Sequence, residues 1–242
     1  MSETTLSPRA SLVQDLWVGG DPRLPGRRLR PFEEPEARIV FLPSLDASLD
    51  LPVLADFLET LAGRAEVIAY QPFAPGALEP VTSQRESLLD RLSSFRRFWP
   101  SPLPEFVVGH GLGGALALSV AAEAGVHGVV ALSPWLSPFE ASREAFEASF
   151  PGLGFEEVLG FLQELGPLGA SAAGELLLIA GRDDGLVRTE ALATRAAGNP
   201  RAVLAVMPGG AGAPLAPPWG RVVAVWAGEV ARHSRSAAPL DG

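Results

Sequence analysis

The sequence predicts a three-layer α/β protein with a mostly parallel sheet and a small helical lid. Short apolar runs alternate along the chain with segments whose apolar residues recur at helical spacing, which indicates βαβ units. Hydrophobic residues make up 47% of the 242 residues, enough to cover both faces of such a sheet. One aromatic-rich segment, about 134–174, interrupts the alternation, and we interpret it as a lid inserted into a single domain that spans residues 1–242.

The strands are expected in the following order. Segments 11–18 and 27–32, which Gly and Pro residues separate, predict an antiparallel hairpin at one edge of the sheet. Six apolar runs predict the remaining strands: 38–42, 66–70, 106–108, 128–132, 175–180 and 202–206.

Helices are expected between these strands. Leucine and phenylalanine at helical spacing predict a helix over 51–61, with Pro52 near its start, and a second helix over 82–98 that stops before Pro100. Small residues predict a third helix over 115–122. The lid is expected to form helices over 138–148 and 154–165 and to carry six aromatic residues: Trp135, Phe139, Phe146, Phe150, Phe155 and Phe161.

The most informative motif lies at positions 105–114, which read EFVVGHGLGG. An apolar strand runs into a tight glycine turn and then into a helix of small residues. This is the layout of the nucleophile elbow, G-x-S-x-G, whose strained turn raises a serine hydroxyl above a parallel sheet. The pattern here is Gly109-His110-Gly111-Leu112-Gly113, so Gly111 stands where the serine belongs. Glycine supplies no nucleophile.

From about residue 30 to residue 235 the chain resembles the α/β-hydrolase superfamily. Pro43-Ser44-Leu45-Asp46 follows the strand 38–42, where the family carries its oxyanion loop. The run 181–187, GRDDGLV, resembles the family's acid turn and aligns Asp184 with the triad carboxylate. The loop 207–214 occupies the place of the family's histidine but contains none, and Ala213 stands among its residues.

The resemblance implies a degenerate member that lacks both nucleophile and base, with Gly111, Asp184 and Ala213 as vestigial catalytic positions. The N-myc downstream-regulated family is similar in one feature only, a glycine at the elbow. The resemblance also implies a pocket, with these lining residues: His110, Leu112, Ser44, Leu45, Ser133 and Trp135.

Several of these residues also have simpler interpretations. Side chains next to an elbow residue point away from it, so we expect His110 to be buried and hydrogen-bonded rather than catalytic. Asp184 is either a surviving pocket carboxylate or a turn former in Asp-Asp-Gly. Ser133 either lines the pocket or ends its strand as part of Ser-Pro. Gly111 itself relieves backbone strain that costs about 1–3 kcal/mol for other residues.

A rival interpretation gives the same glycines a different function. Gly109, Gly111 and Gly114 satisfy G-x-G-x-x-G between a strand and a helix, the fingerprint of dinucleotide binding. That mechanism also needs an acidic residue at the end of the next strand, which here ends in ALSP. The dinucleotide hypothesis therefore ranks below the hydrolase-like one.

Composition excludes several classes of partner. With 28 acidic and 19 basic residues, the net charge of −9 disfavours nucleic acid. The chain has no cysteine, and we expect neither a cofactor nor a metal. No run of 18 apolar residues exists to span a membrane, and no secretory signal is evident, so a cytoplasmic protein is expected.

The sequence therefore predicts a non-catalytic protein that binds a protein partner or a small apolar ligand. The alternative is a carboxylic-ester or related hydrolase with a non-standard catalytic set. Self-association or partner binding is expected through the lid residues 135–165, because segment 149–174 is poor in charge.

Overall fold

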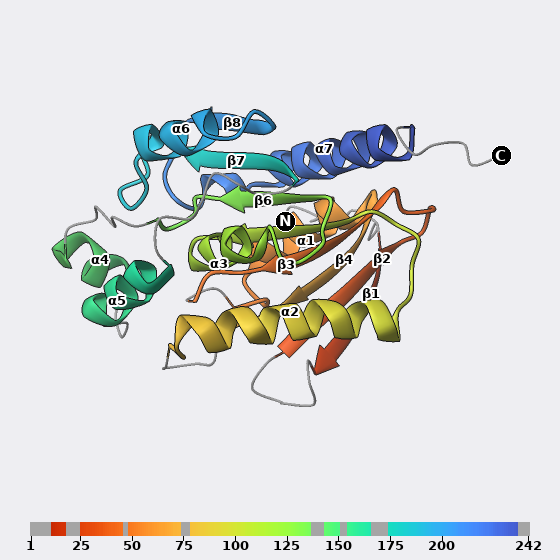
Figure 1. The fold of residues 1–242 in the computed structure, drawn as a ribbon, viewed down its shortest axis with the longest axis horizontal. Helices are drawn as coiled ribbons and strands as arrows, with labels where there is room; N and C mark the ends of the chain where they lie inside the picture. Colours follow the sequence, from red (N-terminus) through yellow and green to blue (C-terminus); the bar gives the residue numbers. More distant parts are fainter. Residues whose placement is uncertain are drawn as a thin grey trace, which may run out of the picture.

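The computed structural model describes residues 11–17, 25–45, 48–73, 78–136, 143–150, 154–165 and 174–236. They form one eight-stranded sheet with helices on both faces and the order β1-β2-β4-β3-β5-β6-β7-β8 (Figure 1). The hairpin of β1 (Ser11–Trp17) and β2 (Pro25–Pro31) joins β4 (Ala65–Tyr70) in antiparallel fashion. All other neighbours are parallel, which confirms the predicted fold class.

The remaining strands agree with the predicted ones to within a residue or two. Their bounds are β3 (Ala37–Leu42), β5 (Glu105–His110), β6 (Gly128–Leu132), β7 (Glu175–Gly181) and β8 (Ala202–Met207). Every residue of β3, β4 and β6 is buried, as apolar runs between two helical layers require.

Two apolar cores lie on the two faces of the sheet. One contains residues of α2 (Val81–Phe98), α3 (Leu112–Val120) and α6 (Thr189–Ala197). It also includes lid residues from α4 (Arg143–Ser149) and α5 (Phe155–Leu165). The other core contains α1 (Pro52–Ala62) and α7 (Pro217–Ser236), which pack against each other. Figure 1 shows α4 and α5 beyond the end of the sheet to which the arrowheads of β6 and β7 point.

The helices differ from the predicted ones in two respects, and a third comparison is incomplete. Of the first lid helix, predicted over 138–148, the structure describes Arg143–Ser149, and residues 137–142 lie outside the described residues. The elbow helix begins at Leu112 rather than at 115. Helices α6 and α7 have no counterpart among the predicted helices, because their buried sides consist largely of small residues or of a single leucine.

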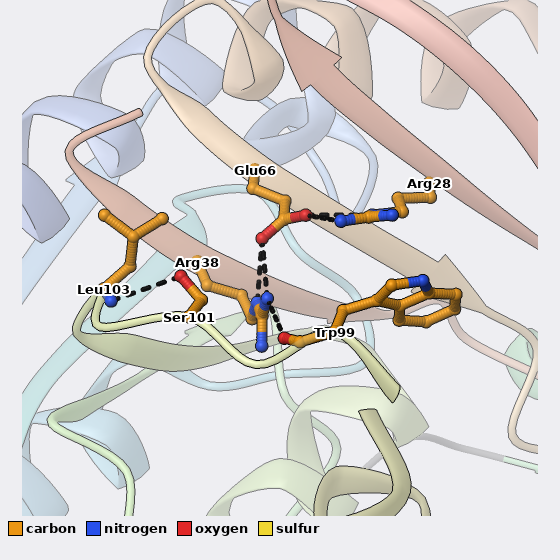
Figure 2. A network of polar contacts seen from close by, with 6 residues as sticks. All are labelled: Arg28, Arg38, Glu66, Trp99, Ser101 and Leu103. Carbon is orange, nitrogen blue, oxygen red and sulfur yellow. Dashed lines mark hydrogen bonds and ion pairs between the residues drawn. The ribbon is translucent and has the colours of Figure 1, made fainter. Parts of the chain in front are cut away.

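A buried polar network fixes the sheet at the start of the parallel strands (Figure 2). The Glu66 carboxylate of β4 accepts hydrogen bonds from Nε of Arg28 at 2.8 Å and from Nε of Arg38 at 2.9 Å. Nη2 of Arg38 also donates to the carbonyl oxygen of Trp99, and the Arg28 guanidinium lies 4.7 Å from the centre of the Trp99 ring. Trp99 follows α2, so the network holds the connection that leads into β5 and its elbow.

Electrostatics explain why a carboxylate is tolerated there. Burial by itself raises the pKa of Glu66, but the hydrogen bonds and charges of Arg28 and Arg38 outweigh burial and hold that pKa below its ordinary value. Glu66 is therefore ionised at neutral pH and provides the counter-charge for the buried guanidinium of Arg38 and the half-buried guanidinium of Arg28.

Candidate functional site

The turn between β5 and α3 has the backbone of a nucleophile elbow. Gly111 adopts φ 55° and ψ −120°, a conformation that side-chain-bearing residues rarely adopt. The turn is held at both ends. Gly111 N donates to the carbonyl of Leu132 at 2.9 Å, and its own carbonyl accepts from the N–H groups of Ala115 and Trp135 at 3.1 Å each.

The space that a nucleophile would occupy is filled by other side chains. A Cβ atom placed on Gly111 would lie 2.6 Å from Oγ and 2.9 Å from Cβ of Ser44, and 3.4 Å from Nε1 of Trp135. Contacts below 3.0 Å essentially never occur for real Cβ atoms. Ser44 and Trp135 are themselves only 1% and 2% exposed. A side chain at position 111 is therefore excluded unless Ser44 moves.

Oγ of Ser44 also accepts a hydrogen bond from the backbone N–H that would stabilise an oxyanion. In a nucleophile elbow, one oxyanion donor is the backbone N–H of the residue after the nucleophile, which here is Leu112. That N–H points to Oγ of Ser44 at 3.4 Å, so a side chain of the same chain takes the place of a substrate oxygen. The Ser44 and Leu45 carbonyls are each 3.3 Å from Nε2 of Gln71, which fixes the loop after β3.

Asp184 acts as a turn former. Its Oδ1 accepts the N–H groups of Leu186 at 2.9 Å and of Val187 at 3.1 Å, which closes the turn after β7. Its second oxygen, Oδ2, is buried and has no hydrogen-bond partner among the described residues. One oxygen of the Asp184 carboxylate therefore closes the turn by accepting two backbone N–H groups.

The loop that follows β8 packs closely on the acid turn. Asp183 accepts the N–H of Gly209 through Oδ2 at 3.2 Å and donates its own N–H to the Gly209 carbonyl at 3.0 Å. A Cβ atom on Gly181 would lie 2.2 Å from that carbonyl, so only glycine fits between the two segments. Ala213, which the sequence analysis expected at a vestigial catalytic position, begins a short 3-10 helix over Ala213–Leu215 and carries only a methyl side chain.

The three histidines lie apart from the elbow position or point away from it. His110 is half-buried, and its Nε2 lies 3.1 Å from the carbonyl oxygen of Ala211 in the loop after β8. His127 and His233 are exposed. Nδ1 of His127 accepts the N–H of Glu105, at the opposite end of β5 from the elbow.

Ser133 is strained and buried beside the elbow. It is the only residue other than glycine in the described part of the chain that has a positive φ, 42°. Its exposure is 0%, and its Oγ has no hydrogen-bond partner among the described residues. Strained backbone with an unpaired polar group is typical of functional sites. No signal in the sequence predicted the strain.

The lid covers this site with aromatic side chains. The ring of Trp135 lies 5.9 Å from that of Phe146 and 5.1 Å from that of Phe150, and Phe146 in turn lies 5.4 Å from Phe155. Phe146 and Phe161 are 0% and 5% exposed. Phe150 and Phe155 are half-buried, whereas Phe139 lies outside the described residues.

The expected pocket residues thus lie near one another, but most are buried rather than facing an open cleft. Leu112, Ser44, Ser133 and Trp135 are at most 2% exposed. None of the strongly exposed large apolar residues in the described part of the chain belongs to the lid. Association through the lid stays a prediction from the sequence.

The glycines of the rival dinucleotide motif have packing roles. A Cβ atom on Gly109 would lie 2.2 Å from the carbonyl oxygen of Gly113, and one on Gly114 would lie 3.0 Å from that of Gly109. In a dinucleotide-binding motif, the glycines let a pyrophosphate approach the backbone closely. Here they let α3 pack closely against the sheet.

The described residues contain neither a metal-binding cluster nor a membrane-spanning helix. No three acidic or histidine side chains of the described residues gather as a metal site would need. No helix in the described ranges is both long enough and apolar enough to cross a membrane.

Comparison with solved structures identifies the fold. Esterase Pf2001 of Pyrococcus furiosus is 17% identical, with 92% of this chain and 90% of that chain covered and a TM-score of 0.69. Est1E from Butyrivibrio proteoclasticus is 13% identical, with coverage of 92% and 99% and a TM-score of 0.69. This chain has the α/β-hydrolase fold. TT1662 from Thermus thermophilus is 20% identical, with coverage of 91% and 98% and a TM-score of 0.67. No family model matches the sequence, and no curated protein is significantly similar to it.

Proposed function

We propose that this α/β-hydrolase-fold protein is not a catalyst and acts by binding. One observation carries the proposal: the nucleophile position is Gly111, and Ser44 fills the space in which a nucleophile and its substrate would meet. Because Ser44 also takes the Leu112 N–H, an oxyanion would have to displace it.

The missing base supports the same conclusion. Serine is a poor nucleophile at neutral pH unless a general base lies within hydrogen-bond reach. The loop 207–214 has no histidine, and the His110 ring faces the carbonyl of Ala211. Ser44, whose Oγ would lie 2.6 Å from a Cβ atom at position 111, therefore lacks the base that a substitute nucleophile needs.

A protein partner is favoured over a small apolar ligand at the elbow. The residues that such a ligand would contact there, among them Leu112 and Trp135, are already buried against the rest of the chain. A partner that binds the outer surface needs no such opening. A cytoplasmic location and a single domain stay predictions from the sequence.

An activity measurement tests the proposal. Purified protein is expected to hydrolyse short p-nitrophenyl esters no faster than a heat-denatured control, and Asp184→Asn is expected to change nothing. The similarity of the fold to esterases favours the alternative, a hydrolase with a non-standard catalytic set. Saturable turnover that Asp184→Asn or Ser44→Ala abolishes would establish that alternative and refute the proposal.

A reconstruction gives a second test. Gly111→Ser alone is expected to stay inactive, because it lacks a base and collides with Ser44. The triple change Gly111→Ser, Ser44→Gly and Ala213→His removes the collision and supplies an imidazole. Weak ester cleavage is expected if Oδ2 of Asp184 accepts a hydrogen bond from the imidazole N–H. Robust turnover by Gly111→Ser alone would reveal a base already present, and His110→Ala would then identify it.

A further inference from the structure

Helix α2 begins without a cap of its own. Its N-cap residue is Pro80, whose side chain makes no cap hydrogen bond, and its first turn contains no acidic residue. The N–H of Gln84 donates to the carbonyl of Pro80 at 3.1 Å, so by helix geometry the N–H groups before Gln84 lie outside the intrahelical ladder. The start of a helix also carries a partial positive charge, which negatively charged groups stabilise. Anionic hydrogen-bond acceptors from elsewhere in the chain would therefore stabilise the start of α2.

The lid helix α5 supplies two such acceptors. Oε1 of Glu157 accepts the N–H of Leu78, which precedes α2, at 2.8 Å. Oε2 of Glu164 lies 3.5 Å from the backbone nitrogen of Val81, the first residue of α2, at the limit of a hydrogen bond. Figure 1 shows α5 beside the end of α2 at which that helix begins. Two carboxylates of the lid thus lie at the N-terminus of a helix outside the lid.

The spacing of these glutamates places them on one side of α5. Glu157, Phe161 and Glu164 follow one another at intervals of four and three residues, which puts them on the same side of a helix. Phe161 is buried, and its ring lies 6.2 Å from that of Phe73 in an edge-to-face arrangement. This side of α5 thus has an apolar centre, with a carboxylate one turn before it and another one turn after it.

A neighbouring glutamate of α5 has its partner inside the lid instead. Arg143 of α4 forms ion pairs with Glu147 of its own helix and with Glu156 of α5. Its guanidinium also lies 5.1 Å from the centre of the Phe155 ring. Glu156 and Glu157 are adjacent and both exposed, but Glu156 binds within the lid and Glu157 binds the segment before α2. The two residues therefore form a matched pair for comparison.

We propose that α5 serves as the N-terminal cap of α2, so that docking of the lid and order in the first turns of α2 form one conformational switch. With the lid docked, Glu157 and Glu164 accept backbone N–H groups and oppose the positive end of α2. With α5 detached, α2 loses both carboxylates and its first turns fray, because Pro80 offers no side-chain acceptor in their place.

The connection between β4 and α2, which the lid contacts, also holds the elbow loop. Phe73, which packs against Phe161 of the lid, lies two residues after Gln71. Nε2 of Gln71 is 3.3 Å from the carbonyl oxygen of Ser44, whose hydroxyl fills the space beside Gly111. The switch goes beyond the proposed function, and it holds whether or not the elbow is catalytic.

Amide hydrogen exchange followed by mass spectrometry tests the coupling. Glu157→Gln combined with Glu164→Gln removes two charges and keeps the size of both side chains. Exchange in residues 84–90 of α2 and 155–165 of α5 is expected to rise by about threefold or more, because the stabilising charges at the helix terminus are lost. Glu156→Gln is the control and is expected to leave exchange in α2 unchanged.

A further substitution distinguishes a lost cap from other effects on α2. Pro80→Ser gives α2 a side-chain acceptor of its own, on extended backbone with φ −51° and ψ 143°. In this background, the double change at Glu157 and Glu164 is expected to raise exchange in α5 as before and to leave α2 protected.

Salt gives an independent readout, because it screens charges at a helix terminus. Raising NaCl from about 0.1 M to about 1 M is expected to increase exchange at the start of α2 in the unmodified protein, and much less in the doubly substituted one. An equal response of the two proteins would contradict the role of charge and overturn the proposal.

The exchange data can overturn the proposal in three further ways. The first is unchanged exchange in α2 after the double change at Glu157 and Glu164, or an equal rise after Glu156→Gln. The second is a rise of the same size in β5 and β6, which would show that the whole fold is destabilised. The third is a rise in α2 that Pro80→Ser does not suppress.

Discussion

Gly111→Ala is expected to destabilise the fold for two separable reasons. The first is backbone strain, because φ is positive, and it costs about 1–3 kcal/mol. The second is overpacking against Ser44, since the new Cβ atom would lie 2.6 Å from Oγ and 2.9 Å from Cβ of that residue, which adds about 1–3 kcal/mol. Together they predict a loss of about 2–6 kcal/mol in the free energy of unfolding.

A matched glycine separates the two contributions. Gly125 also has a positive φ, 61°, but a Cβ atom there would meet nothing within 4 Å. Gly125→Ala is therefore expected to cost only the backbone component, about 1–2 kcal/mol. The excess measured for Gly111→Ala reports the collision with Ser44.

Urea unfolding followed by circular dichroism measures these free energies, and Ser44→Gly closes a double-mutant cycle. In the Ser44→Gly background, Gly111→Ala is expected to cost no more than Gly125→Ala, because the colliding atoms are gone. The reasoning fails if Gly111→Ala and Gly125→Ala cost the same in the unmodified background. It fails equally if Ser44→Gly brings no relief.

Two further stability predictions concern carboxylates. Glu66→Gln leaves the buried guanidinium of Arg38 and the half-buried guanidinium of Arg28 without their counter-charge. It is expected to cost about 3–5 kcal/mol at pH 7, against about 1 kcal/mol or less for Glu36→Gln in a more exposed ion pair. Because the pKa of folded Glu66 is lowered, its ionised form stabilises the fold above the ordinary glutamate pKa. This contribution is lost as the pH falls through the lowered value, so unfolding curves of the two proteins should converge in acid. Asp184→Ala orphans two backbone N–H groups and is expected to cost about 1–3 kcal/mol, whereas Asp184→Asn keeps an acceptor and should cost less; equal losses would refute the turn-forming role.

The strands and the elbow could be predicted from sequence because their signals are local. A run such as RIVFL at 38–42 is apolar throughout, since a strand between two helical layers is buried on both sides. Glycine at position 111 suits the turn between β5 and α3, because the backbone of this turn has a positive φ there. Helix α7 was missed because small residues such as Ala227 and Gly228 form most of its buried side, and they give a weak hydrophobic pattern.

The state of the site depends on contacts between residues far apart in the chain, and these only the tertiary structure decided. Ser44 lies 68 residues before Leu112, and nothing in its local sequence shows that its hydroxyl fills the nucleophile's place. The strain at Ser133 and the burial of the lid aromatics likewise arise from packing between strands and helices. The sequence by itself determined that glycine stands at position 111 and that the loop 207–214 has no histidine, because these facts concern residue identity alone. Whether space remains beside Gly111 depends on packing, and packing is decided only when distant segments of the chain meet.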